Sequence, residues 1–155
     1  MERICKENYY LDIAETVLKR GTCLRRNYGA VIVKNDELVS TGYSGAPRGR
    51  RNCCDFGECT RAKQNIPRGE RYELCRSVHA EANAIIAAER EKMLGATLYL
   101  TGHDGEGGLL SDAYPCAMCQ RLIINAGITR VICRTAPDKY LVVPVREWIE
   151  KDDTL

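Results

Sequence analysis

The sequence has 155 residues, of which 45% are hydrophobic and 28% are charged, and its formal net charge is +2. This size and composition suit one compact α/β domain with a core of its own, so we expect a single domain over residues 1–155. The start, Met1-Glu2-Arg3, leads into no apolar run of signal-peptide length, and no later stretch could span a bilayer. We therefore expect a cytoplasmic protein without a membrane partner.

Nine cysteines are many for this length. An odd number in a chain without an export signal indicates thiolate chemistry or metal binding rather than a disulfide framework, and zinc is the first metal to consider. Basic residues are scattered except for Arg48, Arg50 and Arg51 beside a glycine-rich turn. This balance is too mild for a nucleic-acid groove, and the three arginines are either a solvated loop or a site for a phosphate.

The first half of the chain predicts a helix, a hairpin and a long loop. Apolar residues at helical spacing favour a helix over 9–18. Two β-rich runs, 30–33 and 38–41, flank Lys34-Asn35-Asp36-Glu37 and predict an antiparallel hairpin. Residues 48–76 form a polar, cysteine-rich loop with a short helix at 60–65. A loop of this length needs an additional stabilising interaction.

The second half alternates strands and helices. A helix is predicted over 78–90 with Gly95 closing the segment, and Pro115 and Gly127 bracket another at 116–126. The remaining predictions are strands at 97–101, 130–134 and 140–143, a loop at 102–112 and a terminal helix that starts at Pro144 and carries Trp148. This order predicts one mixed sheet covered on both faces by helices.

Two short motifs stand at the starts of predicted helices: His79-Ala80-Glu81 and Pro115-Cys116-Ala117-Met118-Cys119. Alone, each has an ordinary explanation, a structural histidine or a redox pair. If the helix N-termini converge, their dipoles favour thiolates, and two thiolates with a neutral imidazole bind Zn²⁺ with one position open for water. Together the motifs form the signature of zinc deaminases.

The open position predicts catalysis. A water held there would be activated to attack C4 of a cytosine ring. Glu81, two residues beyond His79, is close enough to carry protons to the ring nitrogen and to the departing ammonia without binding the metal.

Over most of its length the sequence resembles the deoxycytidylate deaminase family, within the cytidine-deaminase-like fold. The stretches that carry this resemblance are 22–26, 29–33, 41–49, 69–76, 79–85 and 123–128. The resemblance implies a three-layer α/β/α sandwich with a five-stranded mixed sheet. It also implies conversion of dCMP to dUMP and ammonia, a homo-oligomer (hexamer or dimer), and dCTP and dTTP as effectors.

The resemblance also implies a second, structural zinc in the cysteine-rich loop. Some family members bind it through a cysteine before the first strand and a Cys or His after the Gly-Tyr-x-Gly turn, where this chain has Cys23 and Cys53. Cys59 and Cys75 are the natural third and fourth ligands, and Cys54 is the spare candidate. The alternative is that these are reduced, partly buried thiols.

Further positions carry over from the family. Substrate contacts are implied at Tyr43, Ser44 and Ala80, although Ser44 replaces the usual asparagine of the turn. Residues 104–113 form an insertion that either reshapes the base pocket as a lid or is a plain surface loop. Arg90 matches a position at the regulatory nucleotide interface, and an ordinary exposed arginine is the alternative.

Three other functions stay open. The chemistry could act on another nucleoside, nucleotide or base amine, for which Ser44 and the insertion are the reasons. A zinc-stabilised nucleotide sensor without activity is a second alternative, against which Glu81 argues. A deaminase of transfer RNA or single-stranded DNA is the third, and we expect no nucleic-acid partner because neither a strong basic surface nor interleaved aromatics are evident.

Overall fold

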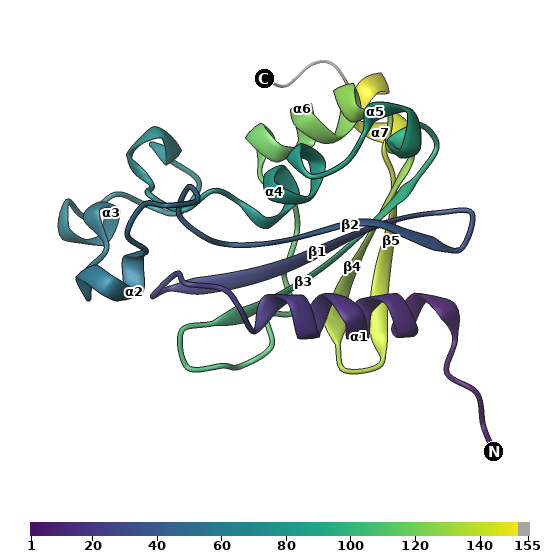
Figure 1. Cartoon of the computed structure of the whole chain (residues 1–155), viewed down its shortest axis with the longest axis horizontal. Helices are drawn as coiled ribbons and strands as arrows, with labels where there is room; N and C mark the ends of the chain where they lie inside the picture. Colours follow the sequence, from purple (N-terminus) through teal and green to yellow (C-terminus); the bar gives the residue numbers. More distant parts are fainter. Residues whose placement is uncertain (152–155) are drawn as a thin grey trace.

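Five strands form one mixed sheet in the order β2-β1-β3-β4-β5 (Figure 1). The computed structural model describes residues 1–151. β1 pairs antiparallel with β2 and β3, β3 is parallel to β4, and β5 is antiparallel to β4. The strands are β1 (Arg26–Lys34), β2 (Glu37–Tyr43), β3 (Thr97–Asp104), β4 (Arg130–Ala136) and β5 (Lys139–Pro144). The predicted five-stranded mixed sheet is confirmed.

Side chains of β1 alternate between two hydrophobic clusters. Ala30 and Ile32 belong to a cluster on one face of the sheet, and Val31 and Val33 belong to a cluster on the other. Because both faces are buried, the strand is a continuous apolar run rather than an alternation of polar and apolar residues. The β1–β2 hairpin closes at Asn35 and Asp36, both with positive φ, as a type I′ turn requires.

Helix α1 (Lys6–Leu18) covers one face of the sheet (Figure 1). Its buried residues, including Leu11 and Ala14, pack with Val31 and Ile132. Gly29 permits this close approach, because a Cβ there would overlap the carbonyl oxygen of Ala14. The prediction of a first amphipathic helix is confirmed, and the helix starts three residues earlier than predicted.

The opposite face carries the other long helices (Figure 1). Buried side chains of α4 (Ala80–Ile86) and α6 (Ala117–Ala126) pack on β1, β3 and β4, together with Met93 of α5 (Arg90–Met93). Trp148 of α7 (Arg146–Glu150) packs against the same cluster. The predicted three-layer α/β/α arrangement is therefore confirmed. No helix of residues 1–151 is long and apolar enough to cross a membrane.

Further predicted boundaries are wrong, including the start of the terminal helix, because Pro144 ends β5 and α7 begins at Arg146. The helix predicted over 78–90 ends at Ile86, and the chain turns before α5 begins at Arg90. This turn brings Met93 into the core, where it is 4% exposed. The loop that was predicted at 102–112 begins only after Asp104. The reason is that β3 continues to Asp104, which pairs with Arg26 of β1. Long-range pairing extends both strands beyond their apolar runs.

The cysteine-rich loop forms two short helices, α2 (Cys53–Phe56) and α3 (Thr60–Lys63), and a 3-10 turn at Tyr72–Leu74, beyond the edge of the sheet where β1 begins and β2 ends (Figure 1). Arg61 is only 7% exposed. Its guanidinium donates to the carbonyl oxygens of Pro67 at 2.7 Å and Glu70 at 3.1 Å and lies over the Tyr72 ring. Arg61 therefore supplies part of the stabilising interactions that a loop of this length requires.

Candidate metal and catalytic site

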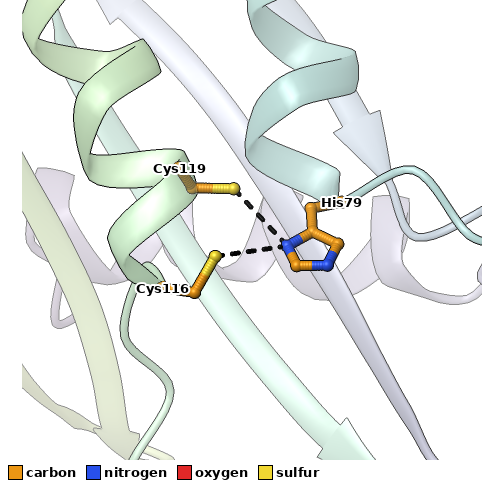
Figure 2. A group of neighbouring side chains, drawn as sticks. All are labelled: His79, Cys116 and Cys119. Atoms are coloured by element: carbon orange, nitrogen blue, oxygen red, sulfur yellow. Dashed lines mark hydrogen bonds between the residues drawn. The ribbon is translucent and has the colours of Figure 1, made fainter. Parts of the chain in front are cut away.

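Three potential metal ligands meet where α4 and α6 begin (Figure 2). His79 is the N-cap of α4, Cys116 is the N-cap of α6, and Cys119 lies in the first turn of α6. His79 Nδ1 is 3.5 Å from both sulfur atoms. Both N-caps have extended backbone, which turns their side chains toward the positive ends of the helix dipoles.

These distances fit zinc. Zn–S bonds of about 2.3 Å and Zn–N bonds of about 2.0–2.1 Å at tetrahedral angles place nitrogen and sulfur about 3.5 Å apart. Within residues 1–151, this is the only group of three or more potential ligands at metal-binding spacing. A His/Cys/Cys set leaves the fourth tetrahedral position without a protein ligand, which is typical of catalytic zinc.

The electrostatics of the group also suit a cation. Hydrogen bonding to Cys116 and to Cys75 raises the pKa of His79 to about 10. Hydrogen bonding with Cys119, and next with His79, lowers the pKa of Cys116 to about 4. Negative charge therefore gathers on the Cys116 sulfur, while hydrogen bonding to Cys116 and burial raise the pKa of Cys119. A metal dication would replace the proton of His79 as the partner of that charge.

Glu81 lies beside the three ligands in the first turn of α4 and is 4% exposed. Burial raises the pKa of its carboxyl group. A carboxyl group that is shielded from water and holds a proton more tightly than usual can act as a general acid and base. Its position next to a potential metal site, outside the ligand group itself, suits that role.

A cavity of 770 Å³ opens over this site. His79, Glu81 and Cys116 line one part, and the cysteine-rich loop lines another. Six arginines also line it: Arg25, Arg26, Arg61, Arg68, Arg76 and Arg121. This cationic lining, beside a metal-binding and proton-transferring centre, suits a small anionic substrate.

Of the three substrate contacts that the family resemblance implies, the structure places only one in the cavity lining of the described chain. Ser44 lines the cavity, and its Oγ accepts a hydrogen bond from the Tyr28 amide at 3.0 Å. Within residues 1–151, the lining does not include Tyr43, which is 36% exposed, or Ala80, which is fully buried. Arg90 is also outside the lining and donates to the carbonyl oxygen of Asn125 at 3.3 Å.

Four cysteines of the proposed structural site line the same cavity: Cys23, Cys53, Cys59 and Cys75. Burial, followed by the Cys23, Cys75 and Cys59 thiols, raises the pKa of Cys53 to about 11. The four side chains are therefore neighbours, although their sulfur atoms are not at the mutual spacing of the His79 group. Cys54 is exposed and is not part of the lining within residues 1–151.

Sequence reasoning missed Arg26, Arg68 and Tyr28. All three line the cavity, and Arg68 donates to Asp112 of the insertion at 2.8 Å. The insertion closes on itself, because the Asp104 carboxylate accepts from two amides of its turn. In the described chain none of residues 104–113 lines the cavity. Alternation along β1 could have indicated Arg26 and Tyr28, whereas Arg68 required the folded loop.

The family model for the cytidine and deoxycytidylate deaminase zinc-binding region matches residues 5–135, and the chain belongs to this family. A deoxycytidylate deaminase of Mycobacterium phage D29 is 37% identical over 137 residues, covering 85% of this chain and 96% of that protein. A deoxycytidylate deaminase of Schizosaccharomyces pombe is 32% identical over 131 residues, which span 84% of this chain but only 37% of that protein.

A similar fold is found in solved structures. The apo crystal structure of dCMP deaminase from the cyanophage S-TIM5 aligns with a TM-score of 0.57 and 26% identity, covering 83% of this chain and 81% of that chain. The same cyanophage enzyme in complex with dCMP and dUMP aligns with a TM-score of 0.56 over 85% of this chain and 84% of that chain. Family and fold therefore agree with the geometry of the His79 site.

Proposed function

We propose that this chain is a single-domain, zinc-dependent hydrolase that deaminates dCMP to dUMP and ammonia. The observation that carries the proposal is the His79, Cys116 and Cys119 group at tetrahedral spacing with the buried Glu81 beside it. The arginine-lined cavity supports a phosphorylated substrate. The names of the D29 and S-TIM5 proteins support deoxycytidylate in particular.

The residues divide the chemistry between them. Zinc held by His79, Cys116 and Cys119 would supply an activated water for attack on C4 of the cytosine ring. Glu81 accepts a proton from the nucleophile, delivers it to the ring nitrogen and then assists the departure of ammonia. Burial supports this shuttle, because the raised pKa of Glu81 lets the carboxyl group hold a proton between the two transfers.

The measurement that tests this function is deamination of dCMP, dCTP, CMP, deoxycytidine and cytosine by zinc-loaded protein, followed as loss of the cytosine absorbance. We expect activity selective for dCMP. Activity on another compound of the series would retain the chemistry and change the substrate. No activity on all five, in protein that contains zinc at the His79 site, would contradict the proposal and favour a nucleotide sensor.

A second zinc at Cys23, Cys53, Cys59 and Cys75 is part of the proposal. It is supported by the gathering of three thiols around Cys53 in a loop that has little core of its own. Metal analysis should give two zinc ions per wild-type chain and one in Cys59→Ser. Cys5→Ser is the control, because Cys5 is the exposed N-cap of α1, and this substitution should leave two zinc ions. One zinc in the wild-type chain would contradict this part.

We also propose a homo-oligomer, a hexamer or a dimer, located in the cytoplasm and regulated by dCTP and dTTP. Exposed apolar side chains on the helices that cover the active-site face of the sheet support self-association. Cysteines that are all free in residues 1–151 are compatible with a reducing compartment. Arg90 remains the proposed contact for the regulatory nucleotide.

A further inference from the structure

Residues of β1 form one wall of the cavity, and this wall carries a positive charge at Arg26. Arg26, Tyr28 and Ala30 share a face of the strand, because side chains alternate between faces. Ala30 lies in the core, and Tyr28 and Arg26 line the cavity. Arg26 Nη1 is buried and has no hydrogen-bond partner among residues 1–151. This cavity wall therefore ends in a guanidinium with unused donor capacity.

Arg68 provides a second guanidinium at the same wall from the cysteine-rich loop. It donates to Asp112 Oδ2 at 2.8 Å, and the two side chains are 45% and 60% exposed. Hydrogen bonding to Arg68 lowers the pKa of Asp112, and the charge of Arg26 also contributes. Burial raises the pKa of Tyr28, while the nearby charges of Arg68 and Arg26 oppose that rise. Two cations thus lie near Tyr28, and Asp112 pairs with one of them, Arg68.

Asp112 balances the charge of one of the two arginines, so one positive charge at this wall is left uncompensated. An exposed ion pair contributes little to stability, so Arg68 can exchange its partner at low cost. A phosphate is a stronger partner than a carboxylate at the cavity rim, because it carries more charge and offers three oxygens to guanidinium donors. The insertion therefore places an internal competitor, Asp112, next to a cation that a substrate phosphate could also bind.

We propose that Arg68 and Asp112 form a clasp at the cavity rim, in which Arg68 recognises the phosphate of a nucleotide and Asp112 competes with that phosphate for Arg68. In the free protein Asp112 holds Arg68 at the cavity rim. When a nucleotide enters, its phosphate takes Arg68 from Asp112 and binds the unpaired donor of Arg26 as well. A nucleoside cannot make this exchange. The inference rests on the proposed function and assigns the insertion a part in setting the affinity for nucleotides.

The clasp is tested by calorimetric binding of dUMP and deoxyuridine to the zinc-loaded protein, since products bind without turnover. Arg68→Met should weaken dUMP binding about 10- to 100-fold relative to deoxyuridine, the cost of a lost hydrogen bond to a charged group. Asp112→Asn should act in the opposite direction and tighten dUMP binding up to about fivefold, since it frees Arg68 from an exposed pair. The Asp112→Asn gain should shrink as salt is added.

Arg71→Met is the matched control. Arg71 pairs with Glu73 in the same loop and is outside the cavity lining in the described chain, so the dUMP preference should be retained. Thermal melting and zinc content verify that each variant is folded. Unchanged or weaker dUMP binding in Asp112→Asn, or equal losses for dUMP and deoxyuridine in Arg68→Met, would overturn the clasp. Failure of the wild-type protein to bind dUMP would instead overturn the proposed function, and the clasp with it.

Discussion

At the scale of single residues, Glu81 shows how position decides the chemistry of a carboxyl group. Glu91, in α5, is exposed and has an ordinary aqueous environment. Glu81, in α4, is 4% exposed and lies next to three potential zinc ligands. The side chains are the same, but Glu81 is buried with a raised pKa beside the reacting centre, whereas Glu91 lies in solvent.

Glu81→Gln should lower the rate of ammonia release from dCMP by about 100- to 10,000-fold, because general acid–base catalysis contributes rate factors of this size. The amide retains the shape of the side chain but cannot accept or return the proton. Steady-state assays on zinc-loaded protein measure the loss.

Glu91→Gln is the control for this substitution and should leave the rate unchanged. The zinc content of Glu81→Gln should equal that of the wild-type protein, because Glu81 is not among the three ligands. Full activity in Glu81→Gln would exclude it as the proton carrier.

At the scale of elements, two glycines set how closely helices approach the sheet. Gly42 on β2 lies against α4, and a Cβ there would overlap backbone atoms of Ala80 and Ala84. Gly29 on β1 lies against α1 on the opposite face. Only α4 carries His79 and Glu81, so the two contacts have different consequences for the site.

Alanine at either glycine should destabilise the fold by about 1–3 kcal/mol, the usual cost of overpacking. For a chain of this size the melting temperature should fall by several degrees. Gly42→Ala should in addition weaken zinc binding, because displacement of α4 moves His79 away from Cys116 and Cys119.

Competition with a chromophoric chelator measures the zinc affinity of both variants. Gly29→Ala is the matched control, and its zinc affinity should remain that of the wild-type protein at temperatures where it is folded. Equal losses of zinc affinity in the two variants would show that general loosening, rather than α4 placement, controls the site.

At the scale of the whole molecule, the helices of the active-site face leave large apolar side chains in solvent. Ile86 of α4 is 76% exposed, Met118 and Leu122 of α6 are 41% and 40% exposed, and Ile149 of α7 is 57% exposed. Met118 and Leu122 are four residues apart and therefore share one side of α6. Such surfaces commonly mark protein contacts.

Leu122→Arg should shift the protein from oligomer to monomer, because a buried unpaired charge opposes association. Light scattering coupled to size exclusion gives the mass of each species. Leu38→Arg is the control, since Leu38 is 50% exposed and belongs to β2 rather than to one of these helices. A monomeric wild-type protein would remove the oligomer from the proposal.

The sequence by itself determined the parts of this protein that depend on local pattern. Helical and strand periodicity predicted the order of the main elements and one mixed sheet, because one face of each element must be buried, and the family resemblance implied five strands. The motifs around His79, Cys116 and Cys119 predicted a zinc site, because ligand type and spacing define the metal chemistry. Helix and strand ends were less accurate, since pairing of Arg26 with Asp104 and burial of Met93 are long-range effects.

Only the tertiary structure decided which distant residues share the cavity. Arg26 is on a strand and Arg68 is in a long loop, and no local pattern relates the two. Asp112 was part of an insertion whose sequence indicated only a loop or a lid, and the fold places it against Arg68. The environment of a polar side chain is set by the segments that pack around it, so the cationic wall became visible only when the chain was folded.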